Sequence, residues 1–178
     1  GMTSLSLAGD PDYSSLCKTL TMVDIGIYPN QDGSDRIVEF MRSAENGFSS
    51  LEEAADYISD FLPHREKPKD LSGLHKNLRK KDDRFYWHWD PKFLQGRQGQ
   101  DIKEYFGHLE KAANFLNIPT LLIRGGLSDV LTEEDKDYFL KVVSHAEFEE
   151  ISNAAHMVAG DKNDIFSKAV EKFLVKNN

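Results

Sequence analysis

The feature that most constrains the fold is a short, continuously apolar run at residues 120–123, which follows Pro119 and ends before Gly125 and Gly126. The run shows no alternation of apolar and polar residues, which is typical of a parallel strand buried on both faces. Asp129 comes shortly after this strand. Catalytic and ligand-binding groups of open α/β sheets lie beyond the carboxyl ends of the strands. The sequence therefore predicts a buried strand with Asp129 as a candidate site residue.

Strands and helices alternate on both sides of this run. Further strands are predicted at 20–26 and 146–151, and helices at 102–116, from Thr132 onward, and from about 164 to 176. Such alternation predicts an α/β fold with about three parallel strands and helices on both faces of the sheet. Residues 1–29 and 101–178 are expected to form this core, and residues 30–100 a helical insertion.

The predicted insertion is a string of short helices and loops. Ser50 and Glu53 have the spacing of a helix-capping box, and residues 96–99 form a glycine-containing break. An aromatic block follows in the second half of the insertion, and its candidate substrate-binding residues are Phe85, Trp87, His88 and Trp89. These rings could line an apolar binding pocket or form the core of the insertion itself, and the sequence leaves both interpretations open.

A histidine, His156, follows the last predicted strand in the segment 153–157. Asp129 and His156 would then stand after neighbouring strands, in the order in which the acid and base of a Ser–Asp–His triad occur on some α/β folds. Each has a simpler alternative. Asp129 could form an Asx-turn or cap the helix after Thr132, and a backbone carbonyl could hold His156. Asp161 and Asp164 are expected to cap the last helix.

The charge and composition of the chain exclude several classes of function. The net charge of the 178 residues is −8, which argues against a nucleic-acid partner. A single cysteine, Cys17, rules out an internal disulfide and favours the reducing cytoplasm. No run approaches the ~20 apolar residues of a membrane span. The histidines are scattered without the spacing of metal ligands, so we expect no metal and no cofactor.

Four stretches together resemble the α/β-hydrolase superfamily, and particularly its soluble esterases, C–C hydrolases and non-haem haloperoxidases with a helical lid. They are residues 21–26, 47–91, 119–129 and 154–160. The resemblance implies that 30–100 is a lid, and that Asp129 holds His156 while His156 activates a serine. The Gly-x-Ser-x-Gly motif of the family is missing, whereas residues 1–8 are similar to the helix that follows it. Ser4 and Ser6 do not replace the missing serine.

The resemblance therefore implies the C-terminal part of a serine hydrolase that acts on an ester or similar bond of a small apolar substrate, and that is inactive without its nucleophile. The alternative is a non-catalytic small-molecule-binding module of the same fold. In a chain cut off in this way, the strand at 20–25 would expose an apolar edge. We therefore expect a homo-oligomer that joins at this edge.

Overall fold

The computed structural model describes residues 1–95 and 100–177, and the predicted break at 96–99 lies outside them. The chain divides into two compact units, one made of Gly1–Ser34 and Arg97–Asn178 and the other of Asp35–Gly96. That these units are a hydrolase core and a lid stays a prediction. The helices are α1 (Met2–Ala8), α2 (Gln31–Ser43), α3 (Leu51–Phe61), α4 (Gln100–Phe115), α5 (Glu133–Val142), α6 (Val158–Asp161) and α7 (Asn163–Lys176). Short 3-10 turns lie at Ser14–Leu16, Ser72–Lys76 and Pro91–Gln95.

The first unit contains a three-stranded parallel sheet, as the sequence predicts. Its strands are β1 (Leu20–Val23), β4 (Thr120–Gly125) and β5 (Glu147–Ile151), in the order β1-β4-β5. Residue Leu20 is paired with Thr120, and Leu121 with Glu147. The continuously apolar strand β4 is the central one, and all six of its residues are buried.

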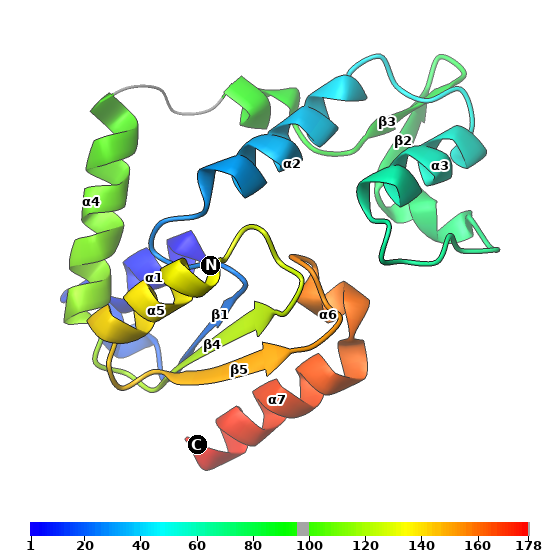
Figure 1. Cartoon of the computed structure of the whole chain (residues 1–178). Helices are drawn as coiled ribbons and strands as arrows, with labels where there is room; N and C mark the ends of the chain where they lie inside the picture. Colours follow the sequence, from blue (N-terminus) through cyan, green and yellow to red (C-terminus); the bar gives the residue numbers. More distant parts are fainter. Residues whose placement is uncertain (96–99, 178) are drawn as a thin grey trace. The chain divides into compact units, whose positions relative to one another are not determined.

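Helices cover both faces of this sheet (Figure 1). On one face Leu122 and Met22 pack against α1, α4 and α5, whose buried residues include Leu109 and Phe139. On the opposite face Leu121, Ile123 and Ile151 pack with Val158 of α6 and Phe173 of α7. The alternation of neighbouring β4 residues between two apolar layers explains why residues 121–123 are apolar without a break.

The second unit differs from the all-helical insertion that the sequence predicts, because it contains a β-hairpin. Strands β2 (Leu78–Lys81) and β3 (Arg84–Trp87) pair in an antiparallel manner. The two residues that join them, Asp82 and Asp83, have φ values of 48° and 63°. Two consecutive residues with positive φ form the tight hairpin turn whose twist matches the flanking strands, and aspartate tolerates this conformation.

A carboxylate of α4 connects two tyrosines of the first unit. The hydroxyl of Tyr28, in the loop after β1, donates to Glu110 Oε2 at 2.7 Å, and the hydroxyl of Tyr138 on α5 donates to Glu110 Oε1. The hydrogen bond to Glu110, followed by burial, raises the pKa of Tyr28 from 10.0 to about 12. The hydrogen bond from Tyr138, and to a lesser degree the one from Tyr28, lowers the pKa of Glu110.

We expect Glu110→Gln to lower the pKa of Tyr28 from about 12 toward 10.0, because the substitution removes the carboxylate that accepts the Tyr28 hydrogen bond and, with it, the negative charge that disfavours tyrosinate. Since folding raises this pKa, the contribution of Tyr28 to stability is complete below pH 10 and is lost as the pH rises through about 12. The difference in tyrosinate absorbance between the protein and its Tyr28→Phe variant, measured during alkaline titration, isolates this group. A Tyr28 pKa that stays near 12 in Glu110→Gln would contradict the assignment.

Candidate active site

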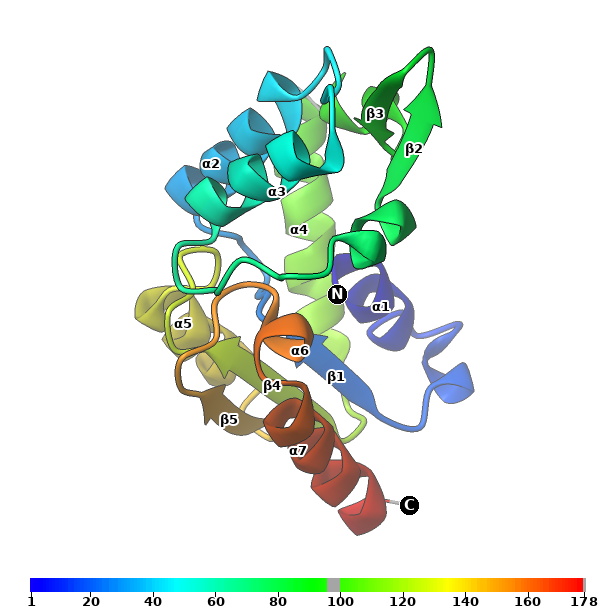
Figure 2. The same ribbon diagram turned by 90° about the vertical axis from the view of Figure 1, so that its right-hand side faces the viewer.

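Three loops that carry polar side chains leave the same edge of the sheet. Asp24 follows β1, residues 126–132 follow β4, and residues 152–157 lead from β5 to α6. Helix α6 lies beyond the carboxyl ends of the strands in both views of the molecule (Figures 1 and 2). This is the edge where open α/β sheets place ligands and catalytic groups.

Asp24 and His156 form a hydrogen-bonded pair at this edge. His156 Nδ1 lies 2.9 Å from Asp24 Oδ2, and the aspartate is completely buried. Asp24 has a φ of 51°, a left-handed backbone conformation that is uncommon outside glycine, asparagine and aspartate. Asn153, which precedes the histidine in its loop, also has a positive φ, 58°. Such conformations cost free energy and cluster at functional sites.

The Asp24 carboxylate accepts two further hydrogen bonds. The backbone N–H of Gly125 donates to Oδ1 at 2.8 Å, and the Ser128 hydroxyl donates to Oδ2 at 2.5 Å. Burial of a charged carboxylate is costly unless hydrogen bonds replace the water that it loses. Three donors surround this carboxylate, so its negative charge is stabilised next to the imidazole.

His156 presents its second ring nitrogen away from the carboxylate. The histidine side chain is 39% exposed, and Nε2 makes no hydrogen bond with the residues that the structure describes. A carboxylate only accepts hydrogen bonds, so this contact favours the neutral tautomer with the proton on Nδ1, which leaves a lone pair on Nε2. The pair therefore has the geometry of a general base whose tautomer is fixed by an aspartate.

The histidine loop is held against the end of β4. Leu127 N donates to Ala154 O at 2.8 Å, and the Asp161 carboxylate accepts from Ala155 N at 2.8 Å. Asp161 therefore supports the site loop. The N-cap position of α7 is occupied by Lys162, and not by Asp161 or Asp164 as the sequence predicts. A Cβ atom on Gly125 would lie 2.4 Å from Ala155 O, so the loop approaches β4 closely because residue 125 is glycine.

The loop after β4 is fixed by a buried arginine. Arg124 Nε donates to Leu131 O at 2.8 Å, and its Nη1 lies 2.6 Å from a Glu150 oxygen and 2.8 Å from one of Glu133. The arginine side chain is 9% exposed. Its bonds join β4, β5 and the start of α5, so they hold the segment that carries Ser128.

The residue that accepts from His156 is Asp24, whereas the sequence assigns this role to Asp129. Asp129 is half-buried in the loop after β4, and its backbone carbonyl lies against Gly33. Asp24 reaches the histidine across the end of the central strand, where the backbone N–H of Gly125 donates to the crossing carboxylate. The sequence does not single out Asp24, because the strand predicted at 20–26 includes this residue, whereas the observed strand β1 ends at Val23.

The aromatic candidates lie in the second unit, where Phe85 and Trp87 contribute to its core. Both pack against a buried cluster that contains Phe48, and the Trp87 and Trp89 rings stack with centroids 4.6 Å apart. His88 Nδ1 lies 3.0 Å from the Lys76 carbonyl oxygen. The structure thus shows a packing role for these rings, and a role in substrate binding stays a prediction.

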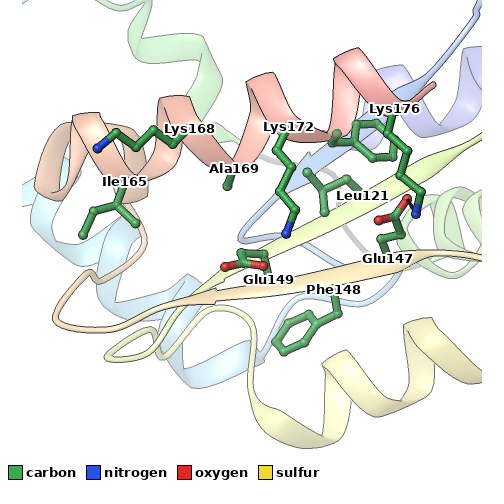
Figure 3. Close-up of a pocket in the computed structure, with 10 residues that line it drawn as sticks. Leu121, Glu147, Phe148, Glu149, Ile165, Lys168, Ala169, Lys172 and Lys176 are labelled. Atoms are coloured by element: carbon green, nitrogen blue, oxygen red, sulfur yellow. Dashed lines mark ion pairs between the residues drawn. The ribbon is translucent and has the colours of Figure 1, made fainter. Parts of the chain in front are cut away.

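Away from Asp24 and His156, the features that bear on function are candidate metal sites, membrane spans and pockets among the residues that the structure describes. Within residues 1–95 and 100–177 no cluster of three His, Cys, Asp or Glu could hold a metal ion. No helix in the described part is both long and apolar enough to cross a bilayer. A groove of about 390 Å³ opens between β5 and α7, where Lys172 extends toward Glu149 and Lys176 pairs with Glu147 (Figure 3). Neither Asp24 nor His156 lines this groove.

Comparison with solved structures finds similar folds at low sequence identity. The chain matches E-2-(acetamidomethylene)succinate hydrolase with a TM-score of 0.79 and 15% identity over 96% of this chain and 62% of that one. It matches an esterase from Mycobacterium tuberculosis with a TM-score of 0.74 and 23% identity, covering 98% of this chain and 57% of that one. It matches an alpha/beta hydrolase from Novosphingobium aromaticivorans with a TM-score of 0.70 and 17% identity, covering 98% of this chain and 62% of that one. The chain therefore spans about 60% of the length of these structures. No family model and no curated protein matches the sequence.

Proposed function

Because the chain has the α/β-hydrolase fold, we propose that Asp24 and His156 are the acid and base of a serine hydrolase site whose nucleophile comes from polypeptide outside these 178 residues. The proposed reaction is cleavage of an ester or a similar bond in a small, largely apolar molecule. The observation that carries the proposal is the hydrogen bond between the buried Asp24 carboxylate and His156 Nδ1. The esterases and hydrolases among the similar structures support the reaction class.

In the proposed reaction His156 Nε2 removes the proton of a serine hydroxyl as the oxygen attacks the carbonyl carbon. The same nitrogen then donates that proton to the leaving group. Asp24 accepts the Nδ1 hydrogen bond throughout and stabilises the imidazolium that forms between the two steps. Serine needs such a base because its hydroxyl is a weak nucleophile at neutral pH.

The serines near the pair have other roles. Ser128 is 9% exposed and donates to Asp24, so its hydroxyl is occupied on the carboxylate side of the pair. Ser4 and Ser6 lie inside helix α1, and they lack the sharp strand-to-helix turn that exposes a catalytic serine. Gly1 at the start of α1 packs against Ile25, the neighbour of Asp24. A segment that precedes Gly1 could therefore reach the site.

A fluorophosphonate probe, which reacts with activated serines, tests the proposal. We expect no covalent labelling of the 178-residue chain, and labelling together with hydrolysis of short-chain aryl esters when the codons upstream of Gly1 are included. His156→Ala should abolish both signals in the longer product. The matched control is His145→Ala, because His145 is an exposed histidine whose Nε2 lies 3.0 Å from the Ile118 carbonyl oxygen. Labelling of the short chain would contradict the proposed absence of a nucleophile.

The second candidate function is a non-catalytic module that binds a small apolar molecule. The stacked pair Trp87 and Trp89 supports this alternative, because such rings provide a flat apolar surface. The same experiment separates the two functions. A longer product that resists the probe, yet shows quenching of tryptophan fluorescence by aryl esters, would favour the binding module over the hydrolase.

We also propose that the chain by itself associates with a second copy through β1. The backbone N–H groups of Leu20 and Asp24 donate to carbonyl oxygens on the side of β1 that faces β4. Because backbone groups alternate in direction along a strand, those of Thr21 point to the opposite, outer edge. In the described sheet no strand pairs with that edge. Strand β1 carries no charge, and the exposed Leu16 lies just before it. The other edge strand, β5, contains three glutamates, which disfavour pairing with a second negatively charged copy.

We expect light scattering at micromolar concentration to show a dimer, and Thr21→Pro to convert it to a monomer. Proline removes the outward N–H without removing a hydrogen bond to β4. Thr21→Val is the control, because it keeps that N–H and should leave the dimer intact. A monodisperse monomer before any substitution would contradict the proposed association.

A further inference from the structure

We propose that Ser128 is a positioning residue that fixes the Asp24 carboxylate in the orientation in which Oδ2 accepts the hydrogen bond of His156. The proposal rests on the proposed function, because it assigns a third group to the same acid–base pair. It concerns a residue that makes no hydrogen bond to His156 and acts through Asp24.

The direction of the Ser128 hydrogen bond follows from its other partners. Ser128 Oγ accepts the backbone N–H of Val130 at 3.1 Å, and Leu131 N lies 3.5 Å away. These N–H groups occupy the acceptor side of the hydroxyl. Its proton is therefore directed to Asp24 Oδ2, which lies 2.5 Å from Oγ.

The backbone donor and the side-chain donor bind different oxygens of the Asp24 carboxylate. Gly125 N holds Oδ1 at 2.8 Å, and Ser128 holds Oδ2. Rotation of an aspartate carboxylate about its terminal bond is otherwise only weakly restricted. With one donor on each oxygen, the plane of the carboxylate is defined, and Oδ2 stays directed toward Nδ1 of His156.

Ser128 can act in this way because its own loop is held in place. Ser128 N donates to Gly125 O at 2.9 Å, and Arg124 Nε donates to Leu131 O at 2.8 Å. Leu131 is fully buried in the apolar layer that faces α4 and α5. The hydroxyl therefore belongs to a segment that is anchored on both sides of it.

Loss of the Ser128 hydroxyl should change the tautomer of the neutral histidine. A carboxylate that rotates away leaves Nδ1–H without its acceptor, and the form with the proton on Nε2 then becomes populated. That form has no lone pair on Nε2 and cannot act as the base. The proposal therefore predicts a spectroscopic change in the 178-residue chain, without any need for a nucleophile.

The test is nitrogen-15 NMR of the His156 ring, in the 178-residue chain and in its variants, at a pH where the ring is neutral. We expect one tautomer, with the proton on Nδ1, in the unsubstituted chain. Ser128→Ala should give a mixture of tautomers and exchange of the Nδ1–H proton with water that is about tenfold faster. Ser128→Thr, which keeps the hydroxyl, should restore the single tautomer.

Two further variants separate this role from a general effect on the loop. Thr132→Ala removes the capping box of α5 in the same loop and leaves the Asp24 contacts in place, so the His156 tautomer should not change. Ser128→Cys preserves the volume of the side chain and has a weaker donor, so it should give a mixture even if Ser128→Ala does not fold. The ring signals of His145 report whether each variant is folded.

A single Nδ1–H tautomer with slow exchange in both Ser128→Ala and Ser128→Cys would overturn the proposal. Asp24→Asn shows which proposal has failed in that case. If Asp24→Asn changes the tautomer and the Ser128 variants do not, Ser128 has no positioning role and the proposed acid–base pair stands. If Asp24→Asn also leaves the tautomer unchanged, the pair itself fails, and the proposed function with it.

Discussion

Gly125→Ala is expected to destabilise the chain by about 2–3 kcal/mol, the upper part of the range for overpacking a tightly packed site. The added Cβ would lie 2.4 Å from Ala155 O and 2.6 Å from Ala154 O. Both neighbours are backbone atoms of the loop that carries His156, so relief of the clash requires movement of that loop. Denaturant unfolding measures the loss of stability, and the His156 ring signals should show loss of its hydrogen bond to Asp24.

The adjacent glycine provides the control for this substitution. A Cβ on Gly126 would meet its nearest neighbours, Glu150 Oε1 and Ser152 Cα, at 3.5 Å, which is an ordinary van der Waals distance. Gly126→Ala is therefore expected to change the free energy of unfolding by less than about 1 kcal/mol. Equal losses for the two variants would show that the approach of the histidine loop to β4 is not the reason for glycine at position 125.

The central part of the fold is predictable from local sequence because several signals agree there. The apolar run after Pro119 predicts β4, and the capping pattern at Thr132 predicts the start of α5. The observed capping box joins Thr132 and Asp135, so local hydrogen bonds fix this boundary without help from the rest of the chain. The three parallel strands and their flanking helices follow from the alternation of these elements.

The hairpin of the second unit is not predicted, because its first strand does not have the sequence of a strand. Strand β2 has the sequence Leu-Arg-Lys-Lys, and only Leu78 is buried. Charged residues have a low preference for strands, so this segment resembles a solvated surface. The informative residues are Asp82 and Asp83, because two adjacent aspartates can adopt the positive φ values of a tight turn.

The carboxylate that pairs with His156 is not predicted from the sequence, for a tertiary reason. The sequence predicts Asp129 beyond the end of a strand, whereas Asp24 falls inside the strand predicted at 20–26 and in the structure follows β1, which ends at Val23. Which of the two aspartates pairs with His156 depends on the order of the strands. Asp24 must cross the end of the central strand β4 to reach a histidine that follows β5. The two donors that hold the crossing carboxylate, the Gly125 N–H and the Ser128 hydroxyl, come together only when the chain is folded.

Asp24→Asn and Asp129→Asn together test which carboxylate serves the histidine, and the first should have the larger effect on catalysis. Asparagine at position 24 would present an amide to Nδ1, so the ring would favour the tautomer with its proton on Nε2. In serine hydrolases that use a triad, this change lowers kcat by about 10⁴. We expect a loss of about 10³ to 10⁴ in esterase activity of the longer product that contains the nucleophile.

Asp129→Asn is the matched control, because Asp129 is an aspartate of the adjacent loop and is half-buried there. Its substitution should leave the His156 tautomer unchanged and alter kcat by less than about tenfold, since Asp24 keeps the hydrogen bond to Nδ1. If Asp129→Asn abolished activity while Asp24→Asn preserved it, the acid would be the residue that the sequence pattern indicates. The contact between Asp24 and His156 would then be structural, and the acid–base mechanism would have to be assigned to Asp129.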